Sequence, residues 1–261
     1  MKYGFLGCGN MGSAIAKALS QRTKEIAVTD RTGKAKAFAE ELGIAYADAE
    51  TVAACDAVFL AVKPQMMRQA MEAIKGILQE KKPLLITMAA GLTMDTIEQM
   101  AGERLPVIRI MPNTPAAVGA GMTIYCCNDL VTDAQRKRFL SDMEPSGRLD
   151  CIPEQLIDAA GVVSGCGPAY IYVFAEALAD GAVACGVPRE KALQYAAATL
   201  VGAGKMLLET GLHPGVLKDN VCSPGGSTIA GINALEQNGF RGIVMDCVKA
   251  SFERNKELGK K

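Results

Sequence analysis

The sequence has a single histidine, His213, and its nine cysteines include no pair with C-x-x-C spacing. Metal sites are usually built from closely spaced His and Cys ligands, so the common metal-site patterns are excluded. An excess of either charge is also missing, because 28 basic and 28 acidic side chains give a formal net charge of zero. Proteins that bind nucleic acid carry a basic patch. We therefore expect no metal and no nucleic-acid partner.

Membrane and export signals are scarce as well. No apolar run without Gly or Pro reaches the length of a membrane span, and no positively charged leader precedes an apolar segment. The irregularly spaced cysteines indicate small apolar residues in a reducing compartment. For the adjacent pair Cys126 and Cys127, we favour packing in a strand over redox activity. We expect a soluble, cytoplasmic protein without a membrane partner.

What the sequence does have is a glycine-rich start. Residues 2–6 are a short apolar run, residues 7–12 have the pattern G-x-G-x-x-G, and residues 13–20 are small and helix-forming. The motif alone also occurs in turns that bind no ligand. The order of strand, glycine loop and helix is typical of a dinucleotide-binding fold.

Each glycine of the motif has an expected role. Gly7 makes the tight turn, Gly9 lets the backbone approach a pyrophosphate, and Gly12 lets the helix pack close to the strand. The pyrophosphate would bind to the free N–H groups at the helix N-terminus. Asp30 follows the next apolar run, residues 26–29, at the distance expected for a ribose contact.

Apolar runs alternate with helical stretches up to residue 152. Runs that are continuously apolar are buried on both faces, which predicts a parallel sheet with helices on each side. These runs are residues 26–29, 56–62, 83–88 and 107–111, and two further candidate strands, residues 121–127 and 147–152, close the domain. Residues 1–152 are thus expected to form an α/β domain with a Rossmann-type doubly wound sheet.

Unusual residues follow three of these strands, at residues 61–64, 89–91 and 111–115. Ligands of such sheets bind at the carboxyl ends of the strands. Each stretch alone is also ordinary turn chemistry. Together the three stretches favour a binding site.

Beyond residue 153, strand signals stop and helical stretches follow. Residues 168–186 are apolar nearly all round, with only Glu176 and Asp180 charged. Such a helix needs burial on all sides, which a small domain alone does not provide. We expect residues 153–261 to form an all-α dimerisation domain.

The second informative stretch is Pro-Gly-Gly-Ser-Thr at residues 224–228, which opens a helix. Such a turn presents backbone N–H groups and two hydroxyls together, a suitable cradle for a small carboxylate or phosphate. The alternative is simple N-capping by Ser227 or Thr228. The residues alone leave both possibilities open.

With these stretches the chain resembles the pyrroline-5-carboxylate reductase family over its whole length. The most specific match is in residues 214–236, with supporting matches at residues 61–64, 111–115 and 164–170. The resemblance implies that L-1-pyrroline-5-carboxylate is reduced to L-proline by NAD(P)H, the last step of proline biosynthesis. It also implies an interleaved homodimer, often assembled further, in which the substrate pocket borrows residues from the neighbouring subunit.

The resemblance also assigns residues. The expected cofactor-binding residues are Gly7, Cys8, Gly9, Asn10, Met11, Gly12, Asp30, Arg31, Thr32, Ala61, Val62, Lys63, Pro64, Ala89, Ala90, Gly91 and Asn220. The expected substrate-binding residues are Ser223, Gly225, Gly226, Ser227, Thr228 and Glu154, and the Thr228 hydroxyl takes the catalytic position.

The reaction needs few catalytic side chains, because a protonated cyclic imine is already an electrophile. The protein mainly has to hold the two reacting carbons together, and the cofactor carries the chemistry. No histidine base is needed, and we expect His213, just before a proline, to have a structural role in a turn.

Two stretches depart from the family pattern. Asp30 favours the free ribose hydroxyl of NADH, whereas Arg31 and Thr32, with Lys34, favour the 2′-phosphate of NADPH. We expect NADPH to be preferred and NADH to be accepted. The second departure is Pro145, which stands where a helix would be expected to continue.

Two other functions fit parts of the sequence. One is a reductase of the β-hydroxyacid dehydrogenase type, or another imine reductase. The β-hydroxyacid dehydrogenase type uses a helical lysine; Lys205 is the candidate, but Glu209 stands where an asparagine is expected. A non-enzymatic dinucleotide-sensing dimer would not need the loop at residues 224–228, which is intact.

Overall fold

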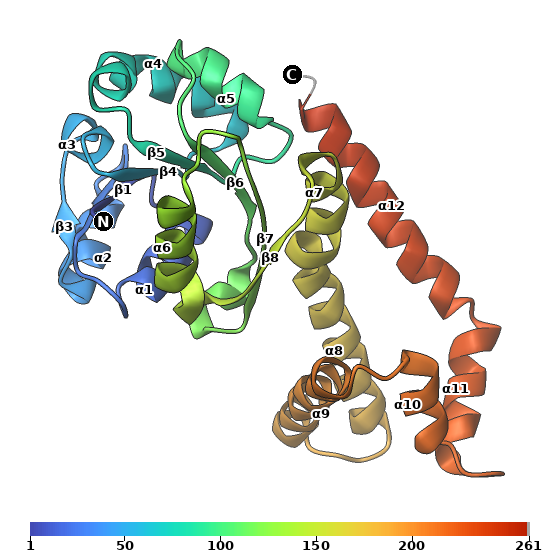
Figure 1. Cartoon of the computed structure of the whole chain (residues 1–261). Helices are drawn as coiled ribbons and strands as arrows, with labels where there is room; N and C mark the ends of the chain where they lie inside the picture. The colour runs from blue at the N-terminus through green and yellow to red at the C-terminus, as the bar shows by residue number, and fades with distance from the viewer. Residues whose placement is uncertain (260–261) are drawn as a thin grey trace. The chain divides into compact units, whose positions relative to one another are not determined.

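The structure is a computed structural model that describes residues 1–259. They form two compact units, shown in Figure 1. The first contains Met1–Pro168 and the chain from Ser251 onward, and the second contains Ala169–Ala250. The domain boundary expected at residues 152 and 153 stays a prediction.

The first unit is built on one eight-stranded sheet with the order β3-β2-β1-β4-β5-β6-β7-β8 (Figure 1). Neighbouring strands are parallel, except that β6 and β7 are antiparallel. The order reverses between β1 and β4, the kind of switch point at which ligands of such sheets bind. The strands are β1 (Tyr3–Leu6), β2 (Ile26–Thr29), β3 (Ala45–Tyr46), β4 (Ala57–Leu60), β5 (Leu84–Thr87), β6 (Val107–Met111), β7 (Gly121–Cys127) and β8 (Gly147–Cys151).

Helices cover both faces of this sheet, and each face has its own apolar core. Strands β1, β4 and β5 are buried along their whole length, as expected for continuously apolar strands. One core includes α3 (Ala49–Ala53), α4 (Pro64–Lys81), α5 (Met94–Ala101) and α7 (Glu154–Gly161). The other includes α1 (Asn10–Leu19), α2 (Lys34–Leu42) and α6 (Asp133–Met143). The doubly wound α/β fold predicted from the sequence is confirmed.

Some elements differ from the expectation. Helix α1 begins at Asn10, inside the glycine motif rather than after it, because Gly9 takes the N-cap position. The sequence analysis did not predict β3, α3 or α5, which are short. At Pro145, α6 gives way to a 3-10 turn, η2 (Glu144–Ser146), and another 3-10 turn, η1 (Thr114–Val118), follows β6.

A buried polar contact fastens α6 to the sheet. The hydroxyl of Tyr3 donates to Asp142 Oδ2 at 2.7 Å, and Arg138 Nε donates to the same oxygen at 2.6 Å. Burial, followed by the interaction with the Asp142 carboxylate, raises the pKa of the Tyr3 phenol. The phenol therefore stays protonated and remains a donor.

The second unit is all-helical, and helix α7 leads into it through a π-helical segment, η3 (Val162–Cys166). Its buried core is small, with Ala179, Ala192 and Ala196 at the centre. Its helices are α8 (Gly167–Ala184) from Ala169 onward, α9 (Arg189–Thr210), α10 (Pro214–Asn220), α11 (Ser227–Gln237) and α12 (Phe240–Gly259) as far as Ala250. Large apolar side chains stay exposed in the single chain, among them Ile171, Tyr172, Val173, Leu178, Tyr195, Val201, Leu207, Leu208, Ile243 and Met245.

The run Glu154–Ala184 is the one helix within residues 1–259 that is long and apolar enough to cross a membrane, judged by length and composition alone. A helix that packs against another subunit has the same composition. The exposed apolar faces of α8 and α9 therefore agree with the all-α dimerisation domain expected from the sequence.

Replacing Tyr3 with phenylalanine removes one donor from the buried Asp142 carboxylate. We expect Tyr3→Phe to lower the free energy of unfolding by about 1.5–3 kcal/mol, the usual contribution of a hydrogen bond to a charged group. Urea unfolding followed by circular dichroism measures the change. Tyr46→Phe, at a half-exposed tyrosine on β3, is the matched control. Equal stability of the two variants would contradict the role given to this contact.

Candidate active site

The glycine motif forms the turn from β1 into α1. Gly7 has a φ of +100°, a conformation that favours glycine, and a Cβ there would lie 2.8 Å from the carbonyl oxygen of Ala61. A Cβ on Gly12 would lie 2.9 Å from the carbonyl oxygen of Gly7. Helix α1 thus lies directly against the end of the strand. This is the geometry that the predicted roles of Gly7 and Gly12 require.

The N-terminus of α1 is open. Gly9 occupies the N-cap position, and within the described residues no side chain caps this end and no acidic residue stands in its first turn. The first amides of a helix lack intrahelical partners, so the N–H groups following Gly9 are available to an anion. A Cβ added to Gly9 would meet no protein atom within 4 Å. The backbone here can therefore be approached closely by a ligand.

The thiol of Cys8 lies in the same loop and stays neutral. Burial, followed by the nearby charge of Asp30, raises the pKa of the Cys8 thiol to about 11. At neutral pH this side chain places no negative charge beside the free amides. The loop is therefore compatible with a phosphate group.

A pocket of about 340 Å³ opens at this edge of the sheet and brings four of the predicted residues together: Gly7, Asp30, Arg31 and Val62. Leu6 and Thr29, at the ends of β1 and β2, also line it. The sequence analysis did not assign the remaining lining residues, Ala49, Met66, Gln69, Ala70 and Ala73. Most of these lie on α4, where positions 66, 69, 70 and 73 share one helical face. That spacing is the signal that could have identified them.

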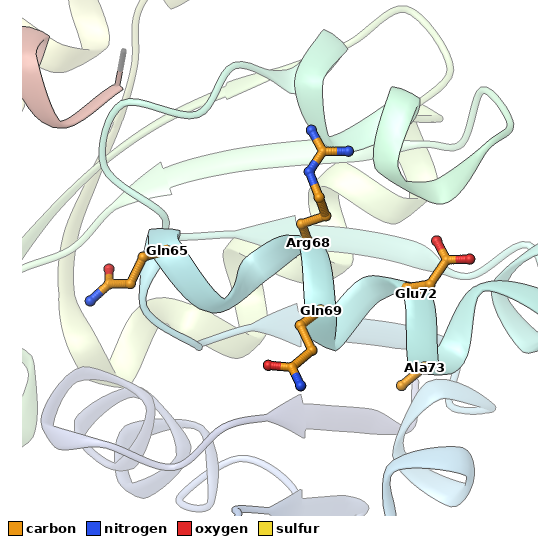
Figure 2. A pocket seen from close by; sticks show the side chains of 5 residues that line it. All are labelled: Gln65, Arg68, Gln69, Glu72 and Ala73. Atoms are coloured by element: carbon orange, nitrogen blue, oxygen red, sulfur yellow. The ribbon is translucent and has the colours of Figure 1, made fainter. Parts of the chain in front are cut away.

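A second, open hollow of about 640 Å³ adjoins this pocket along α4. Its lining residues are Gln65, Arg68, Gln69, Glu72 and Ala73, and Gln69 and Ala73 line both cavities. Figure 2 shows Gln69 and Ala73 on one side of the helix, with Arg68 and Glu72 on the other. Lys63 and Pro64, predicted to contact the cofactor, form the N-cap and first residue of α4.

The carboxylate of Asp30 is turned toward its own loop. Its Oδ2 accepts hydrogen bonds from the hydroxyl (2.5 Å) and the amide (3.3 Å) of Thr32, and its Oδ1 accepts one from the amide of Ala35 at 3.3 Å. Partial burial raises the pKa of the Asp30 carboxyl, but these hydrogen bonds together lower it below its usual value. Asp30 therefore organises the turn into α2, and the neighbouring Arg31 is exposed.

The next predicted stretch, Ala89, Ala90 and Gly91, follows β5. Gly91 has a φ of +74°, and Ala89 is buried. Glu154, expected near the substrate, lies on α7 and is half-buried. Its Oε1 accepts hydrogen bonds from the amide of Met94 at 2.8 Å and from Arg109 at 3.3 Å.

In the second unit, the predicted substrate loop forms a tight turn before α11. The amide of Gly226 donates to the carbonyl of Ser223 at 3.0 Å, and Gly225 has a φ of +67°. Gly226 is the N-cap, and no side chain in the described part of the chain caps this helix, so neither Ser227 nor Thr228 does. The amides of the first turn and the exposed Thr228 hydroxyl are therefore available to an anion.

The other sequence candidates have definite positions in the second unit. Nδ1 of His213 accepts the amide of Gly215 at 3.1 Å and caps α10, so its structural role in a turn is confirmed. Asn220 is the last residue of α10 and is exposed. No group of three or more His, Cys, Asp or Glu side chains within residues 1–259 is placed to hold a metal ion.

Comparison with known proteins identifies the family. Residues 154–258 match the family model for pyrroline-5-carboxylate reductase dimerisation, and residues 2–91 match the model for coenzyme F420-dependent NADP oxidoreductases. The pyrroline-5-carboxylate reductase of Escherichia coli is 40% identical over 266 residues, covering 99% of this chain and 98% of the relative. The chain belongs to the pyrroline-5-carboxylate reductase family.

Solved structures agree with this assignment. The Plasmodium falciparum pyrroline carboxylate reductase with NADP bound is 34% identical with a TM-score of 0.90, covering 99% of this chain and 98% of that one. The Streptococcus pyogenes 1-pyrroline-5-carboxylate reductase is 32% identical with a TM-score of 0.89, covering 98% of both chains.

Membership of the pyrroline-5-carboxylate reductase family confirms the resemblance seen in the sequence. It also confirms the expected enzyme class, an NAD(P)H-dependent oxidoreductase. Lys205, the catalytic candidate of the β-hydroxyacid dehydrogenase alternative, is an exposed residue of α9. Neither this alternative nor a non-enzymatic sensor fits the family assignment.

The two glycines of the loop are expected to respond differently to alanine. Gly9→Ala should fold normally, because its Cβ meets open space, but should weaken NADPH binding at least tenfold by occupying that space. Gly12→Ala should instead lower the melting temperature, because its Cβ meets the carbonyl of Gly7. Cofactor titration by fluorescence and thermal melting separate the two effects.

Gly76→Ala is the control for this pair, since Gly76 is exposed on α4 and its Cβ also meets open space. Unchanged cofactor affinity in Gly9→Ala would show that the ligand does not approach the loop at this point.

Proposed function

We propose that this protein reduces L-1-pyrroline-5-carboxylate to L-proline with NADPH as the hydride donor, the last step of proline biosynthesis. The observation that carries the proposal is the match, over nearly the full length of both chains, to reductases of this name. The open N-termini of α1 and α11 agree with it. One is suited to a pyrophosphate and the other to a small carboxylate.

The residues of the first unit fit the cofactor. Gly7 of the glycine loop, Asp30 and Arg31 line the pocket beside β1, and a Cβ on Gly9 would meet open space. In this proposal the amides of residues 9–12 bind the pyrophosphate. Ala61, Val62, Lys63 and Pro64, with Ala89, Ala90 and Gly91, line the cofactor further along the sheet edge, and Asn220 contacts its nicotinamide end.

NADPH is favoured over NADH by the side chains beside the ribose. Asp30 directs its oxygens into its own loop, while Arg31 and Thr32 are exposed and Arg31 lines the pocket. A guanidinium suits the 2′-phosphate of NADPH because it is a charged, planar donor. The Asp30 carboxylate stays ionised, and its hydrogen bonds turn its oxygens into the loop, so the contact with the 2′-phosphate is assigned to Arg31.

The substrate carboxylate is assigned to the turn before α11. There the amides of Ser227 and Thr228, together with the Thr228 hydroxyl, donate to its oxygens. The Gly226 amide closes the turn onto the carbonyl of Ser223, and Gly225 shapes the turn through its positive φ. NADPH, when bound, supplies the hydride that reduces the imine carbon. The protein residues fix the position of the imine, and no side-chain base is required because the protonated imine is already electrophilic.

Self-association follows from the helical unit. The matched dimerisation family model covers residues 154–258, and the apolar faces of α8 and α9 are exposed in one chain. We propose a homodimer or a larger assembly of dimers.

All nine cysteines are free and the net charge is zero, which supports a cytoplasmic protein without a nucleic-acid partner.

Turnover of the purified protein with pyrroline-5-carboxylate, followed as loss of NADPH or NADH absorbance, tests the reaction and the cofactor together. We expect turnover with both and a higher kcat/KM with NADPH. Arg31→Ala should lower kcat/KM for NADPH about tenfold to hundredfold, the effect of a lost charged hydrogen bond, and leave NADH nearly unchanged.

Arg136→Ala, at a half-exposed arginine of α6 that pairs with Asp133, is the control for Arg31→Ala. Equal losses of kcat/KM with NADPH and NADH in Arg31→Ala would show that Arg31 does not contact the 2′-phosphate. If the wild-type protein binds NADPH in a titration but shows no turnover, the proposed reaction is contradicted.

The Thr228 hydroxyl is tested separately. Thr228→Ala should raise KM for the imine about tenfold to hundredfold, because a hydrogen bond to a carboxylate is lost, and Thr228→Ser should restore most of it. Steady-state kinetics with saturating NADPH give both constants. An unchanged KM in Thr228→Ala would place the carboxylate elsewhere.

A further inference from the structure

A buried guanidinium ties α7 to the sheet. Arg109, in β6, has a side chain that is only 1% exposed. Its two terminal nitrogens donate to Glu154 Oε1 at 3.3 Å and to Asp158 Oδ1 at 2.5 Å. The two carboxylates are four residues apart and therefore lie on one face of α7. Both are directed to the same residue of β6.

The Glu154 carboxylate also binds the start of α5. Oε1 of Glu154 accepts the amide of Met94, the first residue of α5, at 2.8 Å. Met94 follows Gly91 by three residues, and Gly91 ends the stretch proposed to line the cofactor. Through one oxygen atom, Glu154 links that stretch to β6 and α7.

A second link reaches the π-helical segment η3. Asn113, only 7% exposed, lies just after β6; its Oδ1 accepts the amide of Met122 at 2.9 Å, and its Nδ2 donates to the carbonyl of Ser164 at 2.9 Å. The end of α7 also packs closely against the end of β6, because a Cβ on Gly161 would lie 3.0 Å from Met111 Cε. Segments of π-helix are rare and often mark functional sites.

These polar contacts are a costly way to stabilise a fold. A buried ion pair loses hydration, and well-packed apolar side chains of similar size often stabilise a protein equally or better. The Nε of Arg109 is buried and has no hydrogen-bond partner among the described residues. What the cluster provides instead is a defined geometry at the carboxyl end of β6, the edge where ligands of this fold bind.

We propose that Arg109, Glu154 and Asn113 are positioning residues for the reductase reaction. They hold the stretch at residues 89–94 and the backbone at residues 162–167 in a fixed relation to the end of β6. The inference rests on the proposed function for its effect on turnover. It gives Glu154 a supporting role through Met94 and Arg109 in place of the direct substrate contact expected from the resemblance.

Glu154→Gln tests this role because it removes the charge that pairs with Arg109 but keeps an oxygen for the amide of Met94. We expect kcat to fall at least about tenfold, since small displacements of reacting groups are costly, while the dissociation constant for NADPH changes less than about threefold. Glu103→Gln is the matched control. Glu103 pairs with Lys82 at 2.5 Å, is more exposed, and lies just beyond the other end of α5.

Hydrogen exchange of the NADPH-bound protein gives a readout that does not depend on turnover. In Glu154→Gln, exchange should rise at both residues 89–94 and residues 162–167, and Glu103→Gln should change neither. This result would support the link even if the wild-type protein failed to reduce the imine, which would overturn only the proposed reaction.

Two results would overturn the inference. One is a rise in exchange at only one of the two segments. The other is a lower melting temperature with an unchanged kcat per folded subunit, which would make the cluster merely structural. Should Glu154→Gln fail to fold, Asn113→Ala removes the link to Ser164 without creating an unpaired charge. It should raise exchange at residues 162–167 and lower kcat, and an unchanged kcat per folded subunit would overturn the inference.

Discussion

Helix α1 begins at the end of β1 because two glycines remove the atoms that would keep helix and strand apart. A Cβ on Gly12 would meet the carbonyl of Gly7, and a Cβ on Gly7 would meet that of Ala61. This approach brings the free amides of α1 to the carboxyl edge of the sheet, next to the point where the strand order reverses. The proposed cofactor pocket depends on that placement, since the ends of β1 and β2 and one face of α4 meet there.

Apolar burial on both faces of the sheet determines the architecture, but polar contacts determine how single elements are placed on it. At the start of β1, Tyr3 bonds Asp142 and fixes α6. Near the end of β6, Arg109 and Asn113 fix α7 and η3. Buried polar groups tolerate little displacement, because leaving one unpaired costs more than the bond contributes. Such contacts are therefore suited to sites that need a defined geometry.

The sequence predicts the parts of this molecule that depend on local patterns. Continuous apolar runs identified β2 and β6 with their observed bounds, and the further candidate strand at residues 121–127 is β7. The glycine motif identified Gly7, which lines the pocket. Helices α3 and α5 are short, and their sequence signals are the N-caps Asp48 and Thr93 and, for α5, the C-cap Gly102.

Contacts between residues that are far apart in sequence could not be predicted from such patterns. Arg109 and Glu154 are 45 residues apart in sequence, so their pairing depends on how α7 packs on the sheet. The direction of the Asp30 carboxylate depends on hydrogen bonds within its own turn, and residue type alone is compatible with either cofactor. The residues of α4 that line the pocket belong to no motif, although their helical spacing is regular.

The helical unit is the part of the chain that most requires self-association. Its buried core centres on three alanines, Ala179, Ala192 and Ala196, while large apolar side chains of α8 and α9 face solvent in the single chain. When a fold needs a second copy to bury its apolar surface, its stability cannot be separated from assembly. The proposed carboxylate loop belongs to this unit, and Ser223 and Thr228 are exposed in one chain. Backbone amides bind a carboxylate more strongly where water is excluded. We therefore expect assembly to complete the substrate site as well as the fold.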